Sequence, residues 1–184
     1  YGGHRIVEVS DIHCAHFTML PVIFKRKGAV IPEQELLRFI DLTQQKDLYA
    51  EIAKGADGFG RDDIKPVMQP FFSIKDEGQF LFDAEKDRHI VLDFFKRNYP
   101  HILQGLLDWH GRFPGVSIKS VANKVESDIM NPICDRLRDI GLHPFRIHDA
   151  VYLPEDETCK VDFDINKAVF DYINRNGTAS SPLC

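Results

Sequence analysis

The segment Phe-Arg-Ile-His-Asp-Ala-Val-Tyr-Leu, residues 145–153, gives the clearest indication of the fold class. Apolar and polar side chains alternate along it, and β-branched and aromatic residues are frequent, as is typical of a strand. Pro144 and Pro154 bound the stretch on either side. The dipeptide His148-Asp149 falls near its middle, where a tight hairpin would expose both side chains at its tip. The sequence therefore predicts two extended segments joined at His148-Asp149.

A further strand is predicted near the start of the chain. Arg5 to Val9 alternates in the same way and ends at Ser10-Asp11. Elsewhere apolar residues recur at helical spacing, with proline and glycine near the ends of the segments. The expected helices are His13 to Phe24, Pro32 to Leu42, Asp47 to Lys54, Arg61 onward, Lys86 to Asn98, Pro100 to Trp109, Ser117 to Ile140 and Val161 to Asn174. Pro66 and Pro70 are expected to interrupt the helix that starts at Arg61.

Length and composition are those of one ordinary domain. The chain has 184 residues, of which 43% are hydrophobic and 28% charged, and its 14 Phe can build a substantial core. No apolar run approaches the ~20 residues of a membrane span and no signal-peptide pattern is present. We therefore expect a cytoplasmic protein, in the host cytoplasm if it is viral, without a membrane partner. The net charge of −5 disfavours a protein that coats nucleic acid, because Lys and Arg supply most non-specific affinity.

Two aspartates stand at the ends of the predicted strands. Nucleotidyl transfer depends on divalent metals that neutralise charge on the attacking and leaving oxygens, and carboxylates hold these hard cations. Asp11 and Asp149 are suited to that task, while Lys65 and Arg61 are suited to a triphosphate. Composition alone does not select these two aspartates from 28 acidic residues.

Three motifs, in order along the chain, resemble motifs A, B and C of family A DNA polymerases and phage-type RNA polymerases. Val9 to His13, followed by an apolar helix, is similar to motif A, in which a strand delivers the first metal-binding aspartate. Arg61 to Lys65 resembles the RxxxK of motif B, the fingers helix that grips the incoming triphosphate. Phe145 to Val151 resembles motif C, a hairpin whose His-Asp pair carries the second metal-binding aspartate.

The spacing of the motifs supports this resemblance. Lys65 follows Asp11 by 54 residues, as in bacterial DNA polymerase I-like enzymes, and Asp149 follows Lys65 by 84, a shorter interval than theirs. Asn123 to Ser127 and the long helix after it look like the approach to motif C in some mobile-element and phage relatives. Glu126 is expected to be an exposed charge on that helix. The resemblance spans roughly Val7 to Pro154.

The resemblance implies a fold and a domain organisation. Residues 1–184 are expected to form a single palm/fingers-like domain of the α+β class. A polymerase palm-like antiparallel sheet, backed by helices, would bring Asp11 beside the hairpin that carries Asp149. An abbreviated fingers segment is expected at about residues 43–115.

The resemblance also implies template-directed nucleotidyl transfer with two divalent metals, Mg²⁺ or Mn²⁺. Asp11 and Asp149 would bind the metals. Lys65 would bind phosphate and protonate the leaving pyrophosphate, and Arg61 would steady the triphosphate. These four residues form the core of the expected catalytic site.

Two histidines and a set of partners follow from the same resemblance. His148 and His16 are expected to contact substrate. His16 stands where DNA polymerases of the family often carry a glutamate that helps exclude ribonucleotides. The partners would be a nucleic-acid primer–template and nucleoside triphosphates, with DNA as the expected product. The chain opens at Tyr1 without an initiator Met, so we also expect a partner subunit or the remainder of a longer chain.

Two other functions stay open at the level of sequence. A non-catalytic palm, retained as a binding or assembly module, is favoured by the negative net charge and by Pro66 and Pro70 after the RxxxK motif. Ser10 to His13 also looks like the DxH that opens metallophosphoesterases. That family needs GDxxD-type and GNH-type segments further along the chain, and this sequence has neither.

Overall fold

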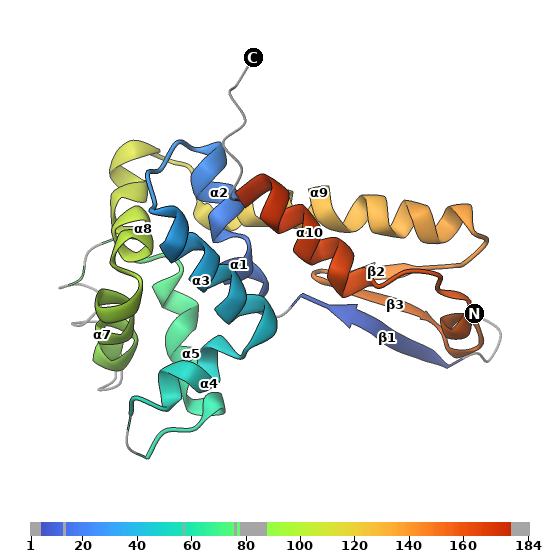
Figure 1. The fold of residues 1–184 in the computed structure, drawn as a ribbon, viewed down its shortest axis with the longest axis horizontal. Helices are drawn as coiled ribbons and strands as arrows, with labels where there is room; N and C mark the ends of the chain where they lie inside the picture. Colours follow the sequence, from blue (N-terminus) through green and yellow to red (C-terminus); the bar gives the residue numbers. More distant parts are fainter. Residues whose placement is uncertain (1–4, 13, 57, 76, 78–87, 178–184) are drawn as a thin grey trace.

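The structure of the chain is a computed structural model that describes residues 5–12, 14–56, 58–75, 77 and 88–177. Its described part combines helices with a small three-stranded antiparallel sheet, so the expected α+β class is confirmed. The sheet lies at one end of the molecule and most of the helices lie at the other (Figure 1).

The sheet has the strand order β1-β3-β2, with β3 in the centre. β1 is Ile6–Asp11, β2 is Phe145–Ile147 and β3 is Ala150–Pro154. Both neighbours run antiparallel to β3. The predicted hairpin is therefore confirmed, because β2 and β3 are joined by His148-Asp149 alone. The predicted first strand is also confirmed, and Asp11 is its last residue.

One face of the sheet is open. Tyr152 pairs with Glu8 on one side and with Phe145 on the other, and Ala150 pairs in the same way with Asp11 and Ile147. Tyr152 and Ala150 are two residues apart in β3, so all their partners lie on the same face. The side chains of Glu8, Asp11 and Ile147 are exposed. This open face therefore carries the first predicted metal-binding aspartate.

Two helices cover the opposite face, α9 (Ile118–Asp139) and α10 (Ile165–Gly177). Figure 1 shows both on one side of the sheet. The buried hydroxyl of Ser10 donates to Oδ1 of Asn166 in α10 at 2.7 Å, and Val151 is fully buried beneath the helices. The expectation that a helix over Ser117 to Ile140 backs the sheet is thus confirmed.

The remaining helices form the other part of the molecule. They are α1 (Ala15–Thr18), α2 (Leu20–Arg26), α3 (Glu33–Gln45), α4 (Leu48–Ala53), α5 (Arg61–Phe71), α7 (Arg88–Asn98) and α8 (Pro100–Arg112). A 3₁₀ helix, η1 (Glu155–Lys160), directly follows β3 and stays beside the sheet. In the part of the chain that the structure describes, none of the helices combines the length and the apolar character needed to cross a membrane.

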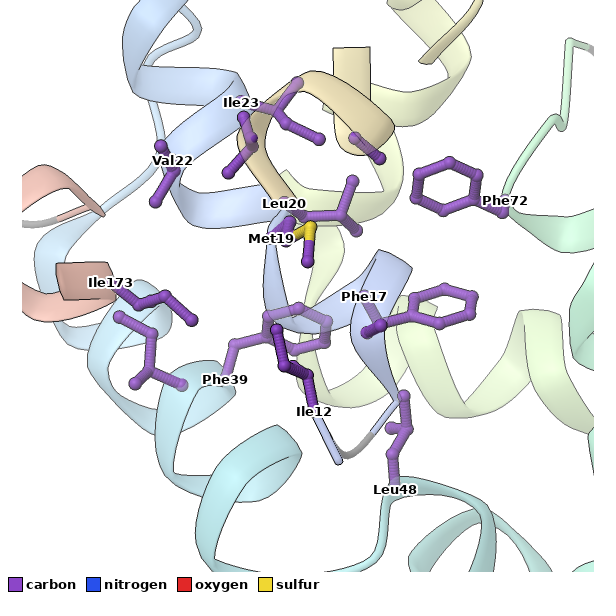
Figure 2. Close-up of a cluster of buried hydrophobic side chains, with 14 of the residues drawn as sticks. Ile12, Phe17, Met19, Leu20, Val22, Ile23, Phe39, Leu48, Phe72 and Ile173 are labelled. Carbon is purple, nitrogen blue, oxygen red and sulfur yellow. The ribbon is translucent and has the colours of Figure 1, made fainter. Parts of the chain in front are cut away.

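One hydrophobic core joins the end of β1 to the helices. Figure 2 shows Ile12, directly after β1, among Phe17, Phe39 and Leu48, side chains that come from α1, α3 and α4. Each of these four residues is at most 4% exposed. Ile173 of α10 joins the same cluster, so the covered sheet and the helical part share their packing. The strand end that carries Asp11 is therefore held in place by the packing of the next residue, Ile12, in the hydrophobic core.

Helix α5 corrects one expectation. It runs unbroken from Arg61 to Phe71 with both Pro66 and Pro70 inside it, so the predicted interruption is wrong. Each proline removes one backbone hydrogen bond from the helix, but the fixed φ of proline is compatible with helical geometry. Ile64, Met68 and Phe71 are all buried on one side of α5. Burying each stabilises the docked helix by about 1.5–3 kcal/mol, which offsets the lost bonds.

Two other helices differ from their predicted bounds. His13 lies outside the described residues, and the rest of the segment predicted to end at Phe24 forms two helices, α1 and α2, that meet at Met19. The last helix begins at Ile165 and not at Val161: η1 ends at Lys160, residues 161–164 are not helical, and Asp164 accepts a hydrogen bond from the N–H of Lys167 in the first turn of α10 at 2.9 Å. Both differences lie outside β1 and the hairpin, the elements that carry Asp11 and Asp149.

A buried carboxylate links α3 to the start of α8. Glu35 of α3 is 4% exposed and accepts hydrogen bonds from the N–H groups of His101 (2.9 Å) and Ile102 (3.0 Å). Its other oxygen lies 2.7 Å from Nδ1 of His101. The first N–H groups of a helix have no partner within the helix and carry partial positive charge, so a carboxylate satisfies both needs. Glu35 thus caps a helix that begins 65 residues later in the chain.

Candidate functional site

Asp11 and Asp149 lie on neighbouring segments at the same end of the sheet. Asp11 pairs with Ala150, the residue directly after Asp149. The N–H of Ile12 donates to the carbonyl oxygen of Asp149 at 3.1 Å, so the backbones of the two segments are hydrogen-bonded at this point. Asp11 is exposed and Asp149 is half-buried. Two residues that are 138 positions apart in sequence are therefore brought together.

The negative charges of both aspartates act on the same side chain of the open face, Tyr152. The hydroxyl of Tyr152 donates to Oε2 of Glu8 at 2.8 Å. That hydrogen bond is the main reason why the pKa of Tyr152 is raised, and the negative charges of Glu8, Asp11 and Asp149 add to the effect. Both carboxylates thus lie close enough to Tyr152 to act on it. The open face carries concentrated negative charge beside the end of β1.

His148 takes an unusual backbone conformation in the turn between β2 and β3. Its φ is +53°, in the left-handed region that is uncommon for residues other than glycine, although Asn, Asp and His adopt it more often than the rest. Two-residue hairpin loops require such positive φ values, which is why glycine and asparagine dominate them. The imidazole of His148 is exposed. The turn therefore presents His148 and Asp149 at its tip, as the sequence predicts.

Arg146 of β2 lies behind this turn, on the covered face of the sheet. Its Nε donates to the carbonyl oxygen of His148 at 2.9 Å, and its Nη2 donates to Oε1 of Glu126 in α9 at 2.5 Å. Its Nη1 donates to Oδ1 of Asn131 at 2.9 Å, and both terminal nitrogens lie 3.3 Å from Oγ of Ser127. Arg146 therefore connects α9 to the backbone of the turn.

The buried position of Glu126 corrects another expectation. Glu126 is 7% exposed, so the prediction of an exposed surface charge is wrong. The face of α9 that carries Glu126 packs against the sheet, and the guanidinium of Arg146 supplies the opposite charge that burial of a carboxylate demands. Helical spacing alone did not reveal this pair because its partner comes from a strand 20 residues away.

Arg61, the first predicted triphosphate ligand, is held by other residues of the chain. It opens α5, and its Nε donates to Oδ2 of Asp47. Its guanidinium also lies 5.5 Å from the centre of the Tyr49 ring. Lys65, one helical turn further along α5, is exposed. Arg61 would have to exchange Asp47 for a phosphate in order to play its predicted role.

Helix α5 is docked beside the segment that follows Asp11. His16 of α1 stacks its ring on Phe72, directly after α5, with the ring centres 5.1 Å apart. At the other end of α5, the charges of Asp47 and Arg61 both act on the thiol of Cys14, whose pKa is raised mainly by burial. The helix after motif A thus adjoins the end of α5 at Phe72, and His16 is half-buried there.

Asp11 and Asp149 are carboxylates, the ligand type that hard divalent cations prefer. Among the described residues, no group of three or more His, Cys, Asp and Glu side chains is arranged to hold a metal. Mg²⁺ commonly takes one or two carboxylates and completes its shell with waters and substrate phosphates. An open hollow of about 490 Å³ adjoins Asp11, between β1, the end of α3 and α10, and its lining includes Asp11 but not Asp149. Asp11 and Asp149 are the residues at this end of the sheet that could hold such an ion.

No family, curated protein or solved structure matches this chain in comparisons of its sequence and fold. Its function is therefore interpreted from the site itself. The relevant features are the adjoining segments that carry Asp11 and Asp149, the histidine in the turn, and helix α5, whose Arg61 acts on Cys14 a few residues after β1.

Proposed function

We propose that this chain is the palm, with an adjoining fingers-like segment, of a template-directed nucleotidyltransferase of the family A polymerase type. One observation carries the proposal: the strand end with Asp11 is hydrogen-bonded to the hairpin turn with Asp149. Two carboxylates from separate strands, meeting at one open end of a sheet, are what a nucleotidyl-transfer site needs from the protein. The ordered resemblance to motifs A, B and C supports the same reading of the site.

The carboxylates and the basic residues have separate roles in the proposed reaction. Asp11 and Asp149 hold Mg²⁺ or Mn²⁺, which supplies charge neutralisation at the attacking 3′-hydroxyl and at the leaving pyrophosphate. Lys65 binds the phosphates from the exposed side of α5 and donates a proton to the pyrophosphate. Arg61 leaves Asp47 and steadies the triphosphate through two parallel hydrogen bonds.

The two histidines contact the substrate in this proposal. His16, whose ring stacks on Phe72 directly after α5, contacts the sugar of the incoming nucleotide. His148 presents an exposed imidazole beside Asp149 and contacts the primer terminus. The partners are then a primer–template and nucleoside triphosphates, with DNA as the expected product.

A primer-extension assay with Mg²⁺ or Mn²⁺ tests the proposal. Asp149→Ala and Asp11→Ala are each expected to lower template-dependent extension by about 10³-fold or more, because a lost metal removes several kcal/mol of transition-state stabilisation. Asp139→Ala is the matched control, since Asp139 is an exposed carboxylate at the far end of α9 and should leave extension unchanged. Equal extension by the wild-type chain and Asp149→Ala would contradict the proposal.

A second candidate is a palm-like module that binds without catalysis. The ion pair between Arg61 and Asp47 favours it, because that pair occupies the side chain that would grip the triphosphate. The negative net charge agrees with a reduced role in gripping nucleic acid. Binding of a primer–template by the wild-type chain, with no extension under either metal, would favour this second function.

A further inference from the structure

The sequence of the turn between β2 and β3 is unusual for a two-residue hairpin loop. A two-residue hairpin loop favours Asn-Gly, Asp-Gly or a leading glycine, and here it is His148-Asp149. His148 carries its side chain at a φ of +53°. Conformations of this kind cost about 1–3 kcal/mol and persist only where the surroundings impose them. The turn therefore needs support from outside itself.

That support comes from one hydrogen bond to each carbonyl group of the turn. The carbonyl oxygen of His148 accepts from Nε of Arg146 at 2.9 Å, and that of Asp149 accepts from the N–H of Ile12 at 3.1 Å. The second donor follows Asp11 directly in the chain. The two bonds together fix the backbone of Asp149 relative to that of Asp11.

Arg146 has no donor left for a substrate. A guanidinium carries five N–H groups, one on Nε and two on each terminal nitrogen. Four acceptor groups surround Arg146 and take five contacts in all: the carbonyl of His148, the carboxylate of Glu126, the amide oxygen of Asn131, and the hydroxyl of Ser127, which faces both terminal nitrogens. Its side chain is 21% exposed and that of Glu126 is 9% exposed. Arg146 therefore acts on the turn and not on a ligand.

We propose that Arg146 is a positioning residue for the candidate metal site, and that it sets the direction of Asp149 by tying the turn to α9 through Glu126. This role rests on the proposed function, because it supposes that Asp11 and Asp149 bind a divalent cation together. Residues that orient metal ligands typically change metal affinity by 10–100-fold when they are lost. The Arg146–Glu126 pair is expected to act in this way.

The test compares Arg146→Lys with Arg26→Lys. Lysine keeps the charge but cannot reach the carbonyl of His148, Asn131 and Glu126 at once. Arg26 is the matched control, because it also ties another element to α9, through Asp128 at 2.7 Å, but it lies on α2, away from the turn. Three quantities are measured on the full chain: thermal stability, amide hydrogen exchange at Ile12 without metal, and Mn²⁺ affinity by electron paramagnetic resonance.

Arg146→Lys is expected to weaken Mn²⁺ binding by about 10-fold or more and to speed exchange at Ile12. Arg26→Lys is expected to lower the melting temperature and to leave both other readouts unchanged. Glu126→Gln keeps the shape of the anchor and weakens its charge, so it should shift both readouts in the same direction by less. This milder variant keeps the test decisive if Arg146→Lys fails to fold.

The outcomes separate this inference from the proposed function. Unchanged exchange at Ile12 and unchanged Mn²⁺ affinity in folded Arg146→Lys would overturn the positioning role, even if Asp149→Ala abolishes Mn²⁺ binding as the proposed function requires. Faster exchange at Ile12 in Arg146→Lys, with no Mn²⁺ binding by the wild-type chain, would support the link from Arg146 to the turn and contradict the metal site. Equal loss of Mn²⁺ affinity in Arg26→Lys would show a general loss of stability and would also overturn the positioning role.

Discussion

The two halves of the candidate site are each held by an arginine–carboxylate pair, and the two pairs differ in burial. Behind the hairpin turn, the side chains of Arg146 and Glu126 are 21% and 9% exposed. At the start of α5, those of Arg61 and Asp47 are 43% and 32% exposed. The first pair links a strand to a helix beneath the sheet, whereas the second lies at the surface between two short helices.

The difference in burial indicates which half of the candidate site is rigid in the absence of a ligand. A buried ion pair with all its hydrogen bonds made is costly to break, because one uncompensated charge would be left inside the protein. An exposed pair contributes little, about 0–1 kcal/mol, and exchanges partners readily. The half that carries Asp149 is therefore fixed before any ligand arrives. The half that would grip a triphosphate is held by a contact that a stronger anion can displace.

The largest expected effect comes from removing the buried carboxylate. Glu126→Ala leaves the guanidinium of Arg146 beneath the sheet without its counter-charge, and we expect it to lower the free energy of unfolding by about 3 kcal/mol. Urea denaturation measures the change. Asp62→Ala is the control, because the side chain of Asp62 is 95% exposed and should matter little. A loss for Glu126→Ala as small as that of the control would remove the contrast between the two halves.

Asp47→Asn tests the surface pair. Asparagine keeps the oxygen that accepts from the N–H groups of Tyr49 and Ala50 at the start of α4, but it loses the charge that holds Arg61. We expect a change in unfolding free energy below about 1 kcal/mol. Affinity for a nucleoside triphosphate should rise by about twofold to fivefold, because Asp47 no longer competes for the guanidinium. Isothermal titration calorimetry measures this affinity.

Weaker triphosphate binding by Asp47→Asn would contradict the exchange of partners at Arg61. Arg61→Lys gives the matching check, because lysine keeps the charge and loses the planar fork that suits phosphate. It should reduce the affinity in the wild-type background, and it should remove the gain that Asp47→Asn brings. A gain that persists in the double variant would place the effect elsewhere.

The smallest expected effect is a dependence of stability on pH. Burial opposes ionisation of Asp47, but the hydrogen bond and charge of Arg61 and the N–H groups at the start of α4 outweigh it, so the pKa of Asp47 is lowered. A lowered carboxyl pKa contributes stability that is present above the ordinary value of about 4 and is lost as pH falls through the folded value. The melting temperatures of the wild-type chain and Asp47→Asn should therefore differ slightly near pH 6 and converge as the pH falls through the lowered pKa of Asp47. A gap that widens in acid would contradict this sign.

Local sequence patterns predicted the elements that carry the aspartates. The alternation over residues 145–153 and its flanking prolines were enough to predict the hairpin and its tip. The shorter alternation from Arg5 predicted β1 and its end at Asp11. Strand periodicity is a property of neighbouring residues, so it can be read along the chain. Pairing of β1 with β3 was expected only through the resemblance, and the register confirms that expectation for Asp11 and Ala150.

Long-range contacts account for the features that the sequence did not predict. Glu126 looks like a surface charge on its helix until Arg146 is placed beneath the sheet. The continuity of α5 depends on what Ile64 and Met68 pack against, and no local pattern contains that information. The pair of Arg61 with Asp47 likewise joins two helices whose docking was not predicted. A charged residue at a covered position of the strand, as at Arg146, was the one signal available in advance.

The capping of α8 by Glu35 has a consequence for how the chain folds. Helices of 13 residues, such as α8, are marginal in isolation, and this one receives its N-terminal carboxylate from a different helix, far away in the chain. An excised peptide covering only α8 would lack that acceptor and would remain largely unstructured in water. Order in α8 is thus coupled to the docking of α3 through this one carboxylate.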